Sequence, residues 1–277
     1  MSQIHWFPGH MSKALTQMSQ KIKIVDVVIE LFDARCPLSS INENLEEITQ
    51  NKKKLIVLTK IDLADPSKTE KWKEQLSKKY PLVLTLNLND KNAENIIAKA
   101  VLKLGEEKRL KEKAKGMKPQ PIRAMIVGIP NVGKSSLINR IAARHAAGVQ
   151  NKPGYTRGEQ WISVNKDFLL LDTPGVLPMN YEDKEKATKL AIIGAIREDI
   201  LPNTFLVDYL LKFLKQEYPN ALKERFDIEE IGKYEDVMEA LCKRRGLLTN
   251  GEYDFLKAES LLLNEFKNGK LGRFTLE

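Results

Sequence analysis

The sequence has few cysteines and no long hydrophobic run. Of its 277 residues only Cys36 and Cys242 are cysteines, far apart and in no metal-ligand spacing. We therefore expect two buried, reduced thiols without a disulfide or metal role. No run approaches the roughly 18 apolar residues that a membrane-spanning helix requires, and the first residues lack the layout of a signal peptide. These absences argue against secreted and integral membrane classes and predict a cytoplasmic protein.

The composition is that of a folded globular protein with an uneven charge distribution. Hydrophobic residues make up 42% and charged residues 30% of the chain, and the formal net charge is +8. Residues 1–178 hold 29 basic and 18 acidic side chains, whereas residues 179–277 hold 16 and 19. The excess of basic charge in the first part is compatible with a polyanionic partner.

Apolar runs divide the chain into an α/β part and a helical part. Helical spacing predicts a helix over 12–23, and β-branched runs predict strands at 24–32, 55–59, 82–86, 122–127, 161–164 and 168–171. Runs this apolar are typical of a parallel sheet covered on both faces. After residue 178 the spacing predicts helices at 186–197, 204–217, 234–245 and 253–267, the last two ended by Gly246 and Gly269. We expect two domains, 1–178 and an all-α domain over 179–277.

Residues 103–118 form a strongly basic segment between the strands predicted at 82–86 and 122–127. It contains seven basic and three acidic residues and is followed by Pro119 and Pro121. A solvated helix with an extended link after it is the favoured interpretation, and a segment that faces a polyanion is the alternative.

Residues 128–135, GIPNVGKS, have the pattern of a phosphate-binding loop between a strand and a helix. Gly128 and Gly133 allow backbone amides to approach phosphates, because a side chain would block them. Lys134 would supply a positive charge to the β- and γ-phosphates. The hydroxyl of Ser135 would bind Mg²⁺. The helix that follows adds a partial positive charge at its N-terminus.

The turn DTPG at 172–175 follows an apolar strand and fits the same nucleotide site. Asp172 could hold Mg²⁺ through a water, and the amide of Gly175 could contact a γ-phosphate. Thr156, which lies between the two motifs, could reach Mg²⁺ from a loop that becomes ordered with the triphosphate. A lone loop threonine also occurs without any such role.

Residues 59–62, TKID, offer the groups that recognise guanine. The Asp62 carboxylate would accept hydrogen bonds from the ring N–H and the amine of guanine, and the stem of Lys60 would cover the base. Adenine lacks that pair of donors and would leave Asp62 desolvated without a partner. The motif therefore predicts a preference for GTP over ATP.

The base motif precedes the phosphate loop by about seventy residues, the reverse of the usual order. The order of TKID, the turn at Asn87, GIPNVGKS, Thr156 and DTPG resembles the circularly permuted GTPases. The stretches WFPGHM near the N-terminus and DARCP at 33–37 narrow the resemblance to the ribosome biogenesis GTPase A (YlqF) family. It covers almost the whole chain.

The resemblance implies a circularly permuted Ras-like P-loop GTPase domain followed by a helical domain that contacts ribosomal RNA. It implies GTP and GDP as ligands and a role late in assembly of the large (50S) ribosomal subunit. Thr59 replaces the asparagine of most GTPases. Asn131 matches the asparagine associated with a potassium ion beside the phosphates in related GTPases. The nucleotide-binding set expected on these grounds is Thr59, Lys60, Asp62, Asn87, Asn131, Val132, Gly133, Lys134, Ser135, Ser136 and Gly175.

The sequence lacks the glutamine that orients the attacking water in Ras-like enzymes, because Val176 stands in its place. This replacement predicts slow turnover without a partner. His10 is the candidate to position the water. Lys134 and Thr156 are the other catalytic candidates. The alternatives for His10 are a cap of the helix predicted from Ser12, or a contact with RNA.

Basic and aromatic residues near the two ends of the chain are candidates for RNA contact. They are Trp6, Phe7, Lys13, Lys21 and Lys23, then Lys243, Arg244 and Arg245, and then Lys267, Lys270 and Arg273. The favoured function is a monomeric GTPase that binds the large subunit in its GTP form and leaves after hydrolysis. The alternatives are a nucleotide-gated RNA scaffold and a kinase that shares only the phosphate loop.

Overall fold

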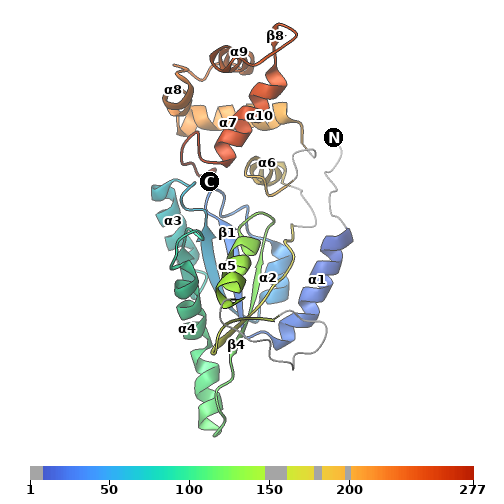
Figure 1. Cartoon of the computed structure of the whole chain (residues 1–277), viewed down its shortest axis with the longest axis vertical. Helices are drawn as coiled ribbons and strands as arrows, with labels where there is room; N and C mark the ends of the chain where they lie inside the picture. Colours follow the sequence, from blue (N-terminus) through green and yellow to red (C-terminus); the bar gives the residue numbers. More distant parts are fainter. Residues whose placement is uncertain (1–8, 147–160, 178–182, 197–200) are drawn as a thin grey trace.

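The computed structural model describes residues 9–146, 161–177, 183–196 and 201–277, and its centre is a six-stranded sheet (Figure 1). The strand order is β3-β2-β1-β4-β6-β5. The strands are β1 (Val27–Asp33), β2 (Lys53–Thr59), β3 (Leu82–Thr85), β4 (Ile122–Gly128), β5 (Trp161–Asn165) and β6 (Phe168–Leu171). All pairs are parallel except β5 with β6, which are antiparallel. The α/β fold predicted from the sequence is confirmed.

The strand pairing brings distant parts of the chain to one edge of the sheet. β4 is fourth in the sequence but pairs directly with β1, with Leu31 opposite Gly128. β2 pairs with the other side of β1, with Asp33 opposite Thr59. Because these strands are parallel, the segments that follow β1, β2 and β4 all leave the sheet at its carboxyl edge.

Helices cover both faces of the sheet. They are α1 (Gly9–Lys21), α2 (Glu43–Thr49), α3 (Pro66–Ser77), α4 (Ala93–Ala114) and α5 (Lys134–Ala146), with a 3₁₀ turn η1 (Ile22–Ile24) after α1. Alternate strand residues face opposite layers, as the period of two requires. Phe32 and Leu58 pack in a small cluster with Leu76 of α3, whereas Leu31 and Val57 belong to the main core.

Residues 103–114 of the basic segment form the second half of α4, and residues 115–118 follow it; Figure 1 shows this end of the helix extending beyond the sheet. Several of its charges are neutralised locally. Lys108 pairs with Asp26 at 2.8 Å, and Lys111 pairs with Glu107 at 2.6 Å. The interpretation as a solvated helix is thus supported by the structure.

The C-terminal part is helical, as predicted. It contains α6 (Lys184–Ile192), α7 (Asn203–Glu217), α8 (Ala221–Phe226), α9 (Tyr234–Arg245) and α10 (Phe255–Lys267). Gly246 ends α9 in the left-handed conformation at φ 63°, which glycine adopts without a Cβ penalty. The helical spacing did not reveal the hairpin β7 (Leu248–Thr249) and β8 (Glu252–Tyr253), whose strands have only two residues each.

Several element bounds and one strand direction differ from the sequence-based expectations. The helix expected at 186–197, for example, ends at Ile192. α1 begins at Gly9 instead of Ser12, so His10 lies within its first turn and does not precede it. β1 begins at Val27, because residues 22–24 form the 3₁₀ turn. Residues 161–164 were expected in the parallel sheet but belong to its antiparallel edge strand, β5. Periodicity reports burial and does not report strand direction, so this last difference has a physical basis.

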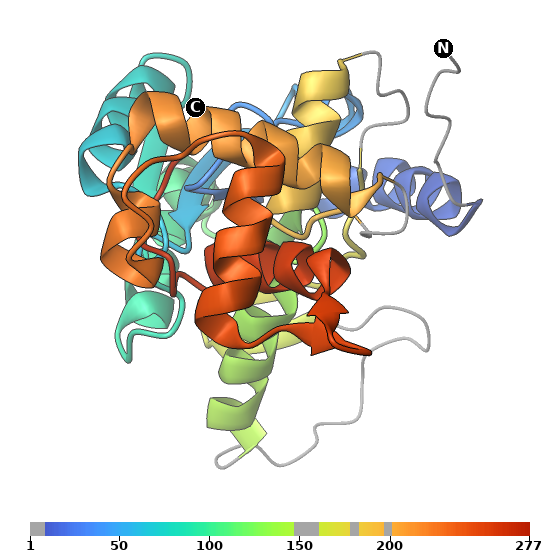
Figure 2. The same ribbon diagram turned by 90° about the horizontal axis from the view of Figure 1, so that it is seen from above.

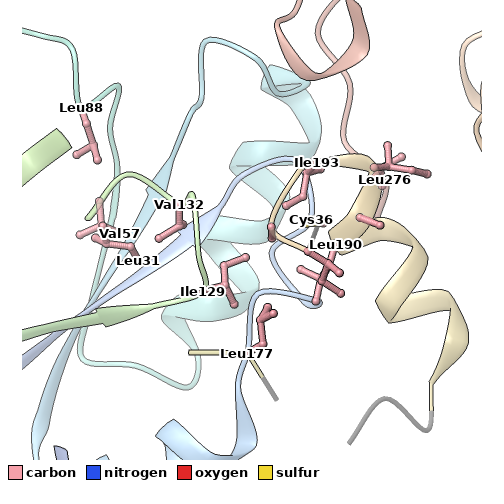
Figure 3. Close-up of a cluster of buried hydrophobic side chains, with 14 of the residues drawn as sticks. Leu31, Cys36, Val57, Leu88, Ile129, Val132, Leu177, Leu190, Ile193 and Leu276 are labelled. Carbon is pink, nitrogen blue, oxygen red and sulfur yellow. The ribbon is translucent and has the colours of Figure 1, made fainter. Parts of the chain in front are cut away.

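The helical part sits over the carboxyl edge of the sheet (Figures 1 and 2). One continuous hydrophobic cluster crosses the junction between the two parts. Figure 3 shows Leu190 and Ile193 of the α6 end beside Cys36 and Leu276, with Ile129 of the phosphate loop close to them. The predicted phosphate loop is therefore packed directly against the helical part.

No helix in the described ranges is long and apolar enough to cross a membrane. Both cysteines are free and buried, as expected.

Candidate nucleotide-binding site

The phosphate loop lies between β4 and α5, as the sequence predicts. Gly133 has φ +111°, and a Cβ atom there would lie 2.7 Å from Leu88 Cδ1, so only glycine fits. The Lys134 ammonium donates to the carbonyl oxygens of Gly128 at 3.0 Å and Ile129 at 2.7 Å. The side chain of Lys134 therefore lies against the backbone of its own loop, with its ammonium bound to two loop carbonyls.

A cavity of about 570 Å³ opens beside this loop. It is lined by the expected residues Asn131, Lys134, Ser135, Asp172 and Gly175, together with Met11, Pro130, Thr173, Pro174, Leu177, Gly194, Ala195 and Ile196. The two motifs GIPNVGKS and DTPG therefore meet at one cavity. A Cβ on Gly175 would lie 2.9 Å from Lys134 Nζ and 3.0 Å from Pro130 Cα, so this glycine permits the close packing of the two segments.

The charges at the cavity are perturbed by burial. Burial lowers the pKa of Lys134 to about 8, against a smaller opposing effect of Asp172. Burial likewise raises the pKa of Asp172, although the Thr173 amide and Lys134 act in the other direction. Charged groups with shifted pKa values that line a cavity are typical of functional sites.

The cavity residues fit a magnesium ion that is held jointly with phosphates. No cluster of three or more His, Cys, Asp or Glu able to hold a metal occurs within the described ranges. Mg²⁺ typically uses only one or two protein oxygens and completes its shell with phosphates and water. Asp172 and Ser135 line the cavity and supply oxygens of this kind.

The guanine motif lies next to the phosphate loop. The Thr59 hydroxyl donates to the Val132 carbonyl at 2.8 Å and so joins the end of β2 to the phosphate loop. Lys60 has φ 55°, and its ammonium lies 3.0 Å from Asp33 Oδ2. Asp62 is exposed, and its carboxylate forms no hydrogen bond or ion pair with any described residue. Its acceptor oxygens are therefore available to a ligand.

Asn87 and Ser136 also lie near this edge of the sheet. Asn87 follows β3, and its side chain accepts a hydrogen bond from the Asn89 amide at 2.8 Å. Ser136 is exposed in the first turn of α5. Neither residue lines the cavity beside the phosphate loop.

Residues near the end of the chain contact the loop 60–65, which carries the guanine motif and is called the guanine loop below. The sequence did not reveal these contacts. Arg273 donates to the carbonyls of Ile61 at 2.6 Å and Ala64 at 3.0 Å. The Phe274 amide donates to the Leu63 carbonyl at 3.1 Å. Arg273 was expected among RNA-binding candidates, but in the structure its guanidinium is occupied by the guanine loop. Carbonyl acceptors leave no signal in a sequence, because every residue has one.

Other expected residues lie partly or wholly outside the described part of the chain. Thr156 is not among the described residues, and neither are Trp6 and Phe7. His10 is described only by its place in α1, although the next residue, Met11, lines the cavity. Val176, in place of the usual glutamine, is fully buried, with its side chain in the hydrophobic core.

Comparison with known proteins assigns the chain to a family. The protein named ribosome biogenesis GTPase A from Bacillus cereus is 45% identical over 278 residues, covering 99% of this chain and 93% of the relative. The chain belongs to the ribosome biogenesis GTPase A family. A member from Thermotoga maritima is 30% identical and covers 98% of this chain and 93% of its own length. Residues 123–241 also match the family described as 50S ribosome-binding GTPase.

Solved structures of the ribosome biogenesis GTPase A family have the same fold. GNP-bound YlqF from T. maritima has a TM-score of 0.68 and 27% identity, and covers 96% of this chain and 97% of its own. A GDP-bound YlqF structure has a TM-score of 0.69 and 26% identity, with 94% and 98% covered. The chain is accordingly a GTPase.

Proposed function

We propose that this GTPase is an assembly factor that binds the maturing large ribosomal subunit with GTP and leaves it after hydrolysis. The names of its relatives and of the matching family support this role. The structural observation that carries the site assignment is the hydrogen bond from Thr59 to the Val132 carbonyl at 2.8 Å. This contact between residue 59 and the phosphate loop supports a single nucleotide that reaches both motifs.

The guanine base binds at Asp62 and Lys60 in this proposal, with Asn87 at the neighbouring strand end. The phosphates bind along residues 131–136, where Lys134 offsets their charge. Mg²⁺, when bound, would be held by Ser135, Asp172 and Thr156 and would neutralise charge on the phosphates. Gly175 contacts the γ-phosphate through its amide, which ties the DTPG turn to the presence of that group.

A potassium ion beside Asn131 is part of the same proposal. Asn131 has φ 57° and lies on the cavity wall, which supports a place near the phosphates. A cation there would stabilise the charge of the transition state, as an arginine does in other GTPases. Hydrolysis measured in potassium and then in sodium at equal ionic strength tests this part, with faster turnover expected in potassium.

His10 positions the attacking water in the proposed reaction. Burial of Val176 excludes its side chain from this task, and Met11 places the first turn of α1 at the cavity. A histidine can accept a proton from water or donate to developing charge. Ribosome-stimulated turnover should fall in His10→Ala, and unchanged stimulation would remove His10 from the mechanism.

The helical part, proposed as a separate domain from about residue 179, contacts ribosomal RNA. Lys243 is exposed at the end of α9 without an ion pair to any described residue. Arg244 pairs with Asp227 at 2.6 Å, so part of this cluster is neutralised within the chain. The contact is therefore proposed as a small patch on a monomeric protein that acts in the cytoplasm.

Multiple-turnover GTP hydrolysis with purified large subunits, small subunits and no ribosome tests the proposed function. We expect slow turnover alone and stimulation by the large subunit only. The alternative, a nucleotide-gated RNA scaffold, predicts binding to the large subunit in the GTP form without stimulation. Equal stimulation by small subunits would contradict the proposed specificity.

A further inference from the structure

Arg35 is the largest fully buried side chain in the described part of the chain, and its contacts reach the helical part. Its guanidinium pairs with Asp33 through two hydrogen bonds, from Nε at 2.9 Å and from Nη2 at 2.7 Å. The same group donates to the Lys267 carbonyl at 3.0 Å and to the Ile193 carbonyl at 3.2 Å. Arg35 thus sits between the end of β1 and the ends of α6 and α10.

The carboxylate held by Arg35 also contacts the guanine motif. Asp33 Oδ2, which accepts from Arg35, lies 3.0 Å from the ammonium of Lys60. Burial alone would raise the pKa of Asp33, but Arg35 and Lys60 hold it well below its usual range. Asp33 is therefore an ionised, buried carboxylate shared by two cations, and its position fixes where the Lys60 ammonium lies.

The turn that follows α6 contacts the phosphate loop as well. The carbonyl of Gly194, next to that of Ile193, accepts a hydrogen bond from Asn131 Nδ2 at 2.7 Å. Gly194 has φ +79°, a left-handed conformation that glycine adopts without a Cβ penalty. Two successive carbonyls of one turn therefore hold side chains from the guanine side and from the phosphate side of the site.

We propose that Arg35 is a positioning residue for guanine binding. Its guanidinium, which donates to the Ile193 and Lys267 carbonyls of the helical part, fixes Asp33, and Asp33 in turn fixes the ammonium of Lys60. This inference rests on the proposed guanine site at Lys60 and Asp62. It goes beyond that site because Arg35 itself does not touch the base. It also makes the position of the helical part a determinant of guanine affinity.

The variant Arg35→Lys separates charge from geometry. Lysine keeps a positive charge beside Asp33, but one ammonium cannot replace a planar fork that holds both carboxylate oxygens and two carbonyls. Lys60 then loses its fixed partner, and the loop bearing Asp62 becomes less well positioned for the base. We expect the dissociation constant for GDP to rise about tenfold, an effect typical of lost coupling within a buried charge network. The turnover of bound GTP should stay the same while KM rises.

A double-mutant cycle with Lys60→Met distinguishes positioning from general stabilisation. If Arg35 acts through Lys60, then Arg35→Lys should weaken GDP binding in the wild-type background and have little further effect in the Lys60→Met background. Each protein is assayed for GDP affinity and for its free energy of unfolding. Should Arg35→Lys fail to fold, Asp33→Asn replaces it in the same cycle, with the same non-additivity expected.

Arg225→Lys is the matched control. Arg225 also forms a two-pronged pair with a carboxylate, Glu265, with Nη2 to Oε1 at 2.8 Å, but within the helical part. Its replacement should lower stability and leave the affinity for GDP unchanged.

Two results would overturn the inference, and they can be told apart. If Lys60→Met weakens GDP binding but the effect of Arg35→Lys simply adds to it, the guanine site stands and the positioning role fails. If Lys60→Met and Asp62→Asn both leave GDP affinity unchanged, the proposed guanine site fails together with the inference.

Discussion

The two sides of the nucleotide site are built in different ways. On the phosphate side, Lys134 is held by carbonyls five and six residues earlier, and Gly175 packs against Pro130 of the same cavity. On the guanine side, the loop after β2 is held by Asp33 and by Arg273, which lies more than 200 residues further along the chain. Lys134 is thus held within its own loop, and the phosphate side as a whole uses few residues beyond 175, whereas the guanine side depends on residues near the end of the chain.

This difference predicts that the largest single-residue effect lies on the phosphate side. Lys134→Ala removes the charge that faces the β- and γ-phosphates, so GTP affinity should fall by at least about 100-fold, or about 2.7 kcal/mol. Calorimetry or fluorescence of a labelled GTP analogue measures it. Lys60→Met should cost less, because its ammonium is already paired with Asp33. A Lys134→Ala protein that keeps its GTP affinity would contradict the assignment.

Asp62→Asn should change base preference more than phosphate binding. The amide keeps one acceptor oxygen but presents a donor to the guanine ring N–H, so the ratio of GTP to ATP affinity should fall by about 100-fold or more. Competition of both nucleotides against labelled GDP measures the ratio. Asp65→Asn is the control: Asp65 caps the N-terminus of α3 and accepts from Tyr218 at 2.9 Å, so its loss should lower stability without altering the preference. An unaltered ratio in Asp62→Asn would refute its role.

The dependence of the guanine side on distant residues is tested by Arg273→Met. The methionine retains an apolar stem but donates to neither Ile61 nor Ala64, so GDP affinity should fall about three- to tenfold through a looser loop. Lys270→Met is the control, since Lys270 is exposed and forms no ion pair in the described part of the chain. Equal effects of the two substitutions would show that the contacts of Arg273 do not matter.

The smallest expected effect near neutral pH is a pH dependence of GTP affinity, which belongs to the phosphate side alone. Lys134 has a pKa of about 8 in the free protein, so above that pH it must take up a proton when phosphates bind. GTP affinity should therefore be constant below pH 8 and fall above it, by up to about tenfold per pH unit. Titrations between pH 7 and 9 measure this. Asp62→Asn should weaken binding and keep the same profile, and a flat profile in the wild-type protein would exclude the proposed linkage.

The sequence predicted the local structures well and the long-range supports poorly. The phosphate loop and the end of α9 at Gly246 follow from contiguous residues with defined backbone requirements, and both lie where the sequence placed them. The stretch 33–37 was noticed only as part of a family resemblance. Arg35, within this stretch, donates to the backbone carbonyls of Ile193 and Lys267. Because every residue has a backbone carbonyl, the sequence does not indicate which ones accept these hydrogen bonds. The direction of β5 was missed for a similar reason, since burial alone does not fix pairing.

The contacts of residues 273 and 274 with the guanine loop have a consequence for synthesis. The ribosome completes residues 60–65 long before it adds Arg273 and Phe274, whose hydrogen bonds to Ile61, Leu63 and Ala64 hold that loop. A nascent chain therefore carries a finished phosphate motif but an unsupported base pocket until translation has passed the helical part. We therefore expect a chain that has not yet been translated and folded through residue 274 to bind guanine nucleotide more weakly, by at least the three- to tenfold expected for Arg273→Met.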